Sequence, residues 1–234
     1  MAIAPDKVAL LPGQTASFAN YTSNVKGLNG LMIELRGTRA DISIDDFRLT
    51  MGPDNDILNW PLAPAPTGFA FEEGVGDDSD RITMIWDAGD ITNNWLRVEM
   101  LANDVTGLTQ ENVFFFGNVI GEIGNSTTDA RVNLLDVAAI RANQSGFTSA
   151  TIDDFFDIDR DGRVNLIDVA LARANQSGFT ALQLITPGSS SKFGSSSDNG
   201  RQGDTSVKKG LISPSIMLKS NVAPATSIKS IRLK

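Results

Sequence analysis

Apolar and polar residues alternate in short segments over the first half of the chain. Within residues 30–36, for example, Leu31, Ile33 and Leu35 share one face. Further short apolar segments follow at residues 46–51, 81–86, 95–100 and 113–117. A period of two requires one buried face per strand, and several such strands predict two sheets packed face to face. We therefore expect residues 1–118 to form an antiparallel β-sandwich.

The pattern changes in the second half of the chain. Residues 133–143 and 165–175 are rich in Ala and Leu, and their apolar positions have helical spacing. The octet Arg-Ala-Asn-Gln-Ser-Gly-Phe-Thr occurs identically at residues 141–148 and 173–180. This internal duplication predicts two similar loop-helix units within residues 119–186. Their apolar faces should pack against each other or against another element.

The last part of the chain, residues 187–234, is a basic tail. Its first stretch, residues 188–203, is rich in Ser and Gly, the composition of a flexible linker. We expect the tail to be disordered or, alternatively, to form an extended strand donated to a partner. The overall expectation is a multi-domain α and β protein with three segments.

Composition narrows the chemistry that the chain can perform. Its 234 residues include no Cys and no His. Disulfides, thiolate or imidazole metal sites and His-assisted nucleophiles are therefore excluded. A metal held by side chains must bind to oxygen, which indicates calcium, magnesium or manganese. A glycosidase requires a pair of carboxylates on either side of the scissile bond, and no feature of the sequence identifies such a pair. We therefore expect no enzymatic activity.

Charge divides the chain in the same way as the pattern does. Acidic residues outnumber basic residues by 14 over residues 1–186, whereas basic residues outnumber acidic residues by 6 over residues 187–234. An acidic body argues against a general nucleic-acid-binding protein. No apolar run approaches the roughly 18–20 residues of a membrane-spanning helix. The opposite charges of body and tail favour self-assembly as one hypothesis.

The strongest motif lies at residues 157–168, called here the second loop. Oxygen-bearing groups recur at alternate positions, and Gly162 permits a sharp turn. This spacing is that of a calcium loop, in which alternate residues converge six to eight oxygens on one ion. The expected ligands are Asp157, Asp159, Asp161, the carbonyl of Arg163, Asn165 and Asp168.

A degraded copy of this motif lies 32 residues earlier, at residues 125–136, called here the first loop. Ala130 replaces the turn glycine, and Glu122 is a candidate substitute for the first ligand. The corresponding residues are Asn125, Thr127, Asp129, Arg131, Asn133 and Asp136, of which two are carboxylates. We expect weak calcium binding here, or a vestigial site held by hydrogen bonds.

The duplicated loop-helix resembles the dockerin type I family over about residues 121–186. The resemblance implies a small EF-hand-related helical domain, calcium as cofactor and a cohesin-like module as partner. The family's recognition positions fall on Leu134, Leu135, Leu166 and Ile167, where Ser-Thr is usual. This departure favours an apolar partner surface, the chain's own sandwich or a neighbouring protomer.

Trp95 is a candidate for sugar binding, because the alternation places it on the polar face of its strand. A position at the sheet edge or in an interface explains its placement equally well. The preceding sandwich resembles cohesin-like or carbohydrate-binding modules of bacterial exoproteins, and this makes polysaccharide a further candidate ligand.

Together these features predict a secreted, non-catalytic calcium-binding protein for attachment or assembly, located outside the cell or on its surface. It would serve polysaccharide-processing or cell-surface complexes. One alternative is a structural subunit of an extracellular fibre or coat, assembled through the sandwich and the tail. Another is the C-terminal part of a polysaccharide hydrolase. The first residues lack the features of a signal peptide, so either a signal has been removed or the chain belongs to a longer protein.

Overall fold

The regular structure consists of strands in the first half of the chain, two helices in the second and one strand at the end. The computed structural model describes residues 4–36, 41–74, 79–178, 181–188 and 227–233. The strands are β1 (Tyr21–Thr22), β2 (Gly30–Arg36), β3 (Phe47–Gly52), β4 (Gly68–Glu72), β5 (Asp80–Ile85), β6 (Trp95–Met100), β7 (Asn112–Asn118) and β8 (Ser227–Leu233). The helices are α1 (Leu134–Ala142) and α2 (Leu166–Ala174), with short 3₁₀ turns at Phe18–Asn20, Ile44–Asp46 and Ile57–Asn59.

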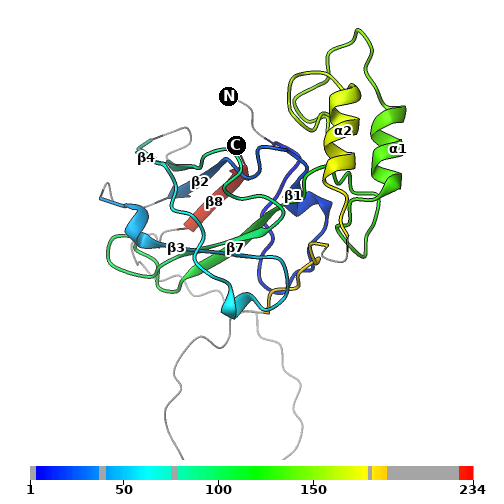
Figure 1. Cartoon of the computed structure of the whole chain (residues 1–234). Coiled ribbons are helices and arrows are strands. Elements are labelled where there is room, and N and C mark those ends of the chain that lie inside the picture. Colours follow the sequence, from blue (N-terminus) through cyan, green and yellow to red (C-terminus); the bar gives the residue numbers. More distant parts are fainter. Residues whose placement is uncertain (1–3, 37–40, 75–78, 179–180, 189–226, 234) are drawn as a thin grey trace, which may run out of the picture.

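The strands form two four-stranded sheets, which confirms the expected sandwich (Figure 1). One sheet has the order β1-β7-β6-β3 and the other has the order β4-β5-β2-β8. All neighbours are antiparallel except β1 and β7, which run parallel. Strand β4 was not predicted, although its half-buried Phe69 and Phe71 alternate with the exposed Ala70 and Glu72.

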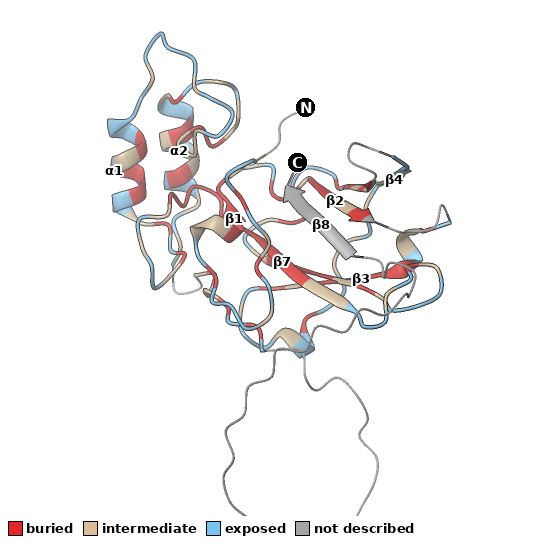
Figure 2. Ribbon diagram, turned by 180° about the vertical axis from the view of Figure 1, so that it is seen from behind, coloured by how far each residue is buried: buried red, intermediate tan, exposed pale blue. Residues whose placement is uncertain are grey.

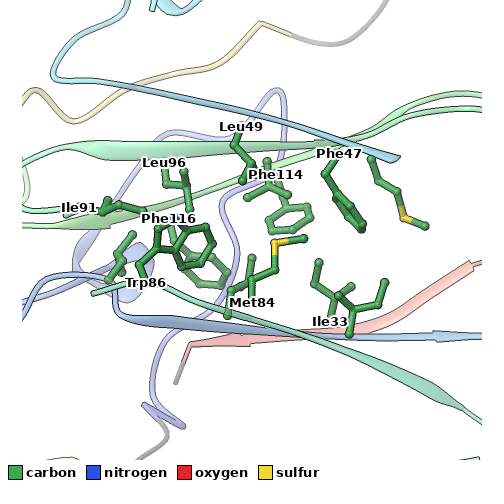
Figure 3. Close-up of a cluster of buried hydrophobic side chains, with 14 of the residues drawn as sticks. Ile33, Phe47, Leu49, Met84, Trp86, Ile91, Leu96, Phe114 and Phe116 are labelled. Atoms are coloured by element: carbon green, nitrogen blue, oxygen red, sulfur yellow. The ribbon is translucent and has the colours of Figure 1, made fainter. Parts of the chain in front are cut away.

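The core lies between the two sheets, where the alternating residues meet (Figure 3). Leu31, Ile33 and Leu35 of β2 are all but fully buried, as their shared face predicted. Across the core lie Phe114 and Phe116 of β7, whose rings are arranged edge to face at 6.3 Å. Burial of these faces supplies the main stabilisation of the sandwich.

The outer face of the sheet that contains β6 and β7 is also buried. Leu10, Leu182 and Ile185 lie in one apolar cluster with Trp95 and Phe115. Three backbone hydrogen bonds hold the segment after α2 against the sandwich: from Gln183 N to Pro53 O, from Ala16 N to Ile185 O and from Gly13 N to Pro187 O. Both faces of this sheet are thus covered, so alternation does not separate core from surface there.

The end of the basic tail forms β8, which pairs antiparallel with β2 of the same chain at the edge of the sheet. The tail was expected to be either disordered or an extended strand donated to a partner. Residues 227–233 do form a strand, but it pairs with β2 of the same chain. The register shifts between Glu34 and Leu35. Ile228 pairs with Leu35 and Ile231 pairs with Ile33, and both partners face the core. The two isoleucines are three residues apart, so without the register shift they could not both pair with residues that are two apart. The expectation for residues 189–226 lies outside the described residues.

Helices α1 and α2 lie side by side at one end of the sandwich (Figures 1 and 2). Each begins at an Asn cap, where Asn133 Oδ1 accepts from Leu135 N and Asn165 Oδ1 accepts from Ile167 N, both at 2.7 Å. A shared apolar cluster buries the facing sides of the two loop-helix units; it includes Ile120, Val137, Ile140, Ile158, Val164 and Ala172. No helix in the described part of the chain is long and apolar enough to cross a membrane.

The helical unit also packs against the sandwich. The Val25 amide donates to the Ile158 carbonyl at 2.9 Å, and Ser23 Oγ donates to the Phe155 carbonyl at 3.1 Å. The rings of Phe18 and Phe155 meet edge to face at 5.6 Å. These contacts hold the second loop and the segment before it directly against the sandwich.

Candidate metal centre

The second loop gathers its first three carboxylates at one point. Ligand oxygens of Asp157, Asp159 and Asp161 all lie within 4.8 Å of one another. Asp157 is buried, Asp159 is half-buried and Asp161 is exposed, so the cluster opens to solvent on one side. This is the cluster that the loop spacing predicted.

Backbone amides of the loop hold these carboxylates in place. Asp157 accepts from the amides of Asp161 and Gly162, at 3.2 and 2.9 Å. Asp161 in turn accepts from the amide of Arg163 at 2.8 Å. Gly162 has a φ of +87°, which an L side chain rarely adopts. The turn glycine therefore has the conformational role expected from the sequence.

The last two predicted side-chain ligands close the loop. Asp168 is fully buried and accepts from the amides of Ile158 and Asn165, at 2.7 and 2.8 Å. The side-chain oxygen of Asn165 caps α2. Asp168 does not belong to the group of three carboxylates that the described residues bring together. It links the beginning of the loop to the beginning of the helix.

Electrostatics favour a cation at this cluster. Burial raises the pKa of the Asp157 carboxyl, the like charge of Asp168 acts in the same direction, and the Gly162 amide opposes them. A bound cation would remove this penalty on the ionised form. The donor set consists of oxygens only, which suits a hard ion such as calcium. The residues present therefore fit calcium.

Hydrogen bonds take the place of charge in the first loop. Asn125 Nδ2 donates to Asp136 Oδ1 at 2.9 Å, where the second loop has a carboxylate at each of these two positions. Asp136 also accepts from the amides of Ile123 and Asn133. Among the described residues the first loop holds no group of three carboxylates.

The turns of the two loops differ at their sixth position. Gly162 of the second loop has a positive φ, whereas Ala130 of the first loop is not among the residues with positive φ. The first loop thus avoids the strain that alanine would suffer in a calcium-loop turn. The three remaining predicted ligands lie at its surface: Thr127 and Arg131 are exposed, and Asp129 is half-buried.

Glu122 is a buried acid beside the first loop. Its carboxylate accepts a hydrogen bond from the hydroxyl of Tyr21. The single N–H of the Gly124 amide is shared between its two oxygens, with both N···O distances at 3.0 Å. Burial is the largest influence and raises the pKa of Glu122 to about 7. Glu122 was a candidate ligand of the first loop from its place in the sequence. Only the fold reveals that the Tyr21 hydroxyl, from the sandwich, reaches the Glu122 carboxylate.

Four apolar side chains stand exposed on the first turns of the two helices. Leu134 and Leu135 are each 69% exposed, Leu166 is 70% exposed and Ile167 is 53% exposed. The contacts described above between the sandwich and this helical unit involve other residues, such as Phe155 and Ile158. Each repeat thus exposes a pair of apolar side chains at equivalent positions.

Trp95 does not occupy the position that sugar stacking requires. It is 0% exposed, and its Nε1 donates to the carbonyl of Gln183 at 2.7 Å. Tyr21 meets its ring edge to face at 5.9 Å. The prediction of a sugar-binding Trp95 is wrong, because residues 181–188 return across the outer face of the sheet and bury it.

Comparison with known proteins identifies the helical region. Residues 126–174 match the family model of the dockerin type I domain. No curated protein and no solved structure matches the chain. Dockerin type I domains bind calcium and attach to cohesin modules, and the acidic cluster of the second loop is consistent with that property. The segment of residues 126–174 is thus identified as a dockerin type I domain, a non-catalytic module for calcium-dependent attachment to another protein.

Proposed function

We propose that this chain is a secreted, non-catalytic attachment protein whose helical unit docks a protein partner in the presence of calcium. The observation that carries the proposal is the exposure of Leu134, Leu135, Leu166 and Ile167 at equivalent positions of both repeats. Another residue of the unit, Phe155, contacts the sandwich. The unit is thus attached to the chain through other residues, and these four apolar side chains are exposed for recognition.

We assign three segments to this protein. Residues 1–118 form the sandwich, residues 119–186 form the calcium-dependent docking unit, and residues 187–234 form the tail, whose strand β8 completes one sheet of the sandwich. The short connection after β7 supports a rigid junction, because Val119 N and Gly121 N donate to backbone carbonyls of Thr22 and Ser23. The docking unit would therefore be held in a set orientation relative to the sandwich.

The second loop is proposed as the calcium site, with the ligands named for it above. Replacement of both Asp157 and Asp161 by Ala should abolish calcium binding measured by titration calorimetry, because two of the three clustered carboxylates are lost. Asp153→Ala, at an exposed carboxylate just before the loop, serves as the control. Undiminished binding by the double variant would refute the site.

Partner recognition is tested with a cohesin module immobilised on a sensor surface. The wild-type chain should bind with calcium present and release in excess chelator. Leu134→Ser combined with Leu166→Ser should weaken binding by tenfold or more, because apolar anchors dominate such interfaces. Ile152→Ser changes an exposed apolar residue that lies on neither helix and should bind normally. Equal binding by all variants would show that Leu134 and Leu166 do not contribute to docking.

A structural role in an extracellular fibre or coat is the second candidate function. It is favoured by the position of β8 at the sheet edge, paired along β2. Exchange of β8 between copies would link them without any other contact. Deletion of residues 227–234 should then abolish assembly seen by light scattering, whereas a chain that stays monomeric at all concentrations would exclude this role.

A further inference from the structure

Each loop of the docking unit is held by the segment that follows the helix of the other repeat. After α1, the amide of Ser145 donates to the carbonyl of Val164 in the second loop at 2.9 Å. The amide of Val164 donates back to Ser145 Oγ at 3.0 Å. A third bond, from Ala150 N to Gly162 O at 2.8 Å, extends the attachment.

The same arrangement recurs with the repeats exchanged. After α2, the amide of Ser177 donates to the carbonyl of Val132 in the first loop at 2.9 Å, and the amide of Val132 donates to Ser177 Oγ at 3.1 Å. Ala130 and Leu182 form an isolated antiparallel β-bridge there. With the repeat of 32 residues, they correspond to Gly162 and Ala150 of the first arrangement.

This reciprocity gives a physical reason for part of the duplicated octet. Ser145 and Ser177 are the fifth residue of its two copies. Each is half-buried, while the valines that they contact are 1% exposed. A buried amide without a partner is costly, so the hydroxyl is required wherever a loop must keep this shape.

The attachment bears directly on the geometry of the proposed calcium site. Gly162 and Val164 flank Arg163, whose carbonyl is the expected backbone ligand. The carbonyls of Gly162 and Val164 both accept from amides of residues 145–150, so the backbone is held on both sides of the Arg163 carbonyl.

We propose that Ser145 is a positioning residue for the calcium site of the other repeat, which it serves by fixing the backbone on both sides of the Arg163 carbonyl. This inference rests on the proposed calcium function. It predicts that calcium affinity at the second loop depends on a hydroxyl that belongs to the first repeat and does not touch the ion.

Ser177 supplies a matched control, because it makes the equivalent contacts with the first loop, where Asn125 Nδ2 already occupies an oxygen of Asp136. Ser145→Ala and Ser177→Ala remove chemically identical hydrogen bonds and should lower thermal stability similarly. By calorimetry with the full chain, Ser145→Ala should weaken calcium binding about threefold to tenfold. Ser177→Ala should leave the affinity of the second loop within about twofold of wild type.

A second pair of variants separates the hydroxyl from the shape of the side chain. Ser145→Thr keeps the hydroxyl and should bind calcium nearly as wild type does, whereas Ser145→Val has the same shape without it and should bind weakly. Amide hydrogen exchange in the calcium-free chain gives an independent readout. Exchange at Val164 should accelerate in Ser145→Val and not in Ser145→Thr.

The outcomes distinguish the inference from the function on which it rests. A wild-type chain that binds no calcium would refute the calcium function, and the inference with it. A wild-type chain that binds calcium beside an unchanged Ser145→Ala variant would overturn the inference alone. Equal weakening by Ser145→Ala and Ser177→Ala would likewise overturn it, because the effect would then follow general stability. Slow exchange at Val164 in Ser145→Val would show that the hydroxyl does not hold this amide.

Discussion

The amide of Val25 in the sandwich donates to the carbonyl of Ile158 in the second loop, at 2.9 Å. Ile158 is the second residue of that loop and lies between Asp157 and Asp159, both expected calcium ligands. This backbone hydrogen bond thus links the second loop to the sandwich. The rings of Phe18 and Phe155 pack edge to face between the same two units.

This connection predicts that calcium stabilises the sandwich as well as the helical unit. All three tryptophans lie within residues 60–95, so tryptophan fluorescence reports on the sandwich and on the cluster that Trp60 and Trp95 share with Val132 of the first loop. At a hundredfold excess of calcium over its dissociation constant, the melting temperature followed by this fluorescence should rise by about 5 °C or more. Asp157→Ala should remove the shift. A fluorescence transition that ignores calcium, while helical circular dichroism responds to it, would show that the two units unfold independently.

Glu122 predicts a pH dependence of stability in the calcium-free protein. Its pKa is raised from 4.5 to about 7 in the folded chain. Its contribution to stability is thus fully present below about pH 4.5 and is lost as the pH rises through 7. The full effect is about 3 kcal/mol at most. Urea unfolding between pH 5 and pH 8 should therefore show falling stability, and Glu122→Gln should flatten this slope.

The control for this measurement is Glu111→Gln, at an exposed carboxylate of the sandwich. It should leave the slope between pH 5 and pH 8 unchanged. If Glu122→Gln preserved the wild-type slope, another group would be responsible for it.

Gly121, in the connection after β7, lies in close contact with helix α2 of the docking unit. Its φ is +84°, and a Cβ added there would lie 2.8 Å from Ala172 Cα of α2. Gly121→Ala should therefore combine backbone strain of about 1–2 kcal/mol with an overpacking cost of about 1–3 kcal/mol. Gly146→Ala isolates the first cost, because Gly146 has a φ of +58° and nothing within 4 Å of the added Cβ.

Chemical denaturation of the two glycine variants makes this comparison. Gly121→Ala should lose clearly more free energy of unfolding than Gly146→Ala does. Equal losses would mean that α2 moves away from residue 121 without cost, and that the junction is looser than the packing indicates.

Local patterns in the sequence determined much of this molecule. Alternation placed β2 and β6 with their observed bounds, and helical spacing placed α1 and α2 to within about a residue. The spacing of Asp157, Asp159 and Asp161 was sufficient to predict their convergence, because a tight loop brings alternate residues to one point. These features depend on neighbours a few residues away, and such neighbours are visible in the sequence.

Contacts between distant segments were decided only by the tertiary structure. Trp95 is buried because residues 181–188 return across its sheet, and β8 pairs with β2 through a register shift that hides its pattern. Ser145 reaches the second loop, and Tyr21 reaches Glu122, across gaps in sequence that no short motif spans. Burial and hydrogen-bond partners belong to the folded arrangement, since each depends on which remote segment covers a residue.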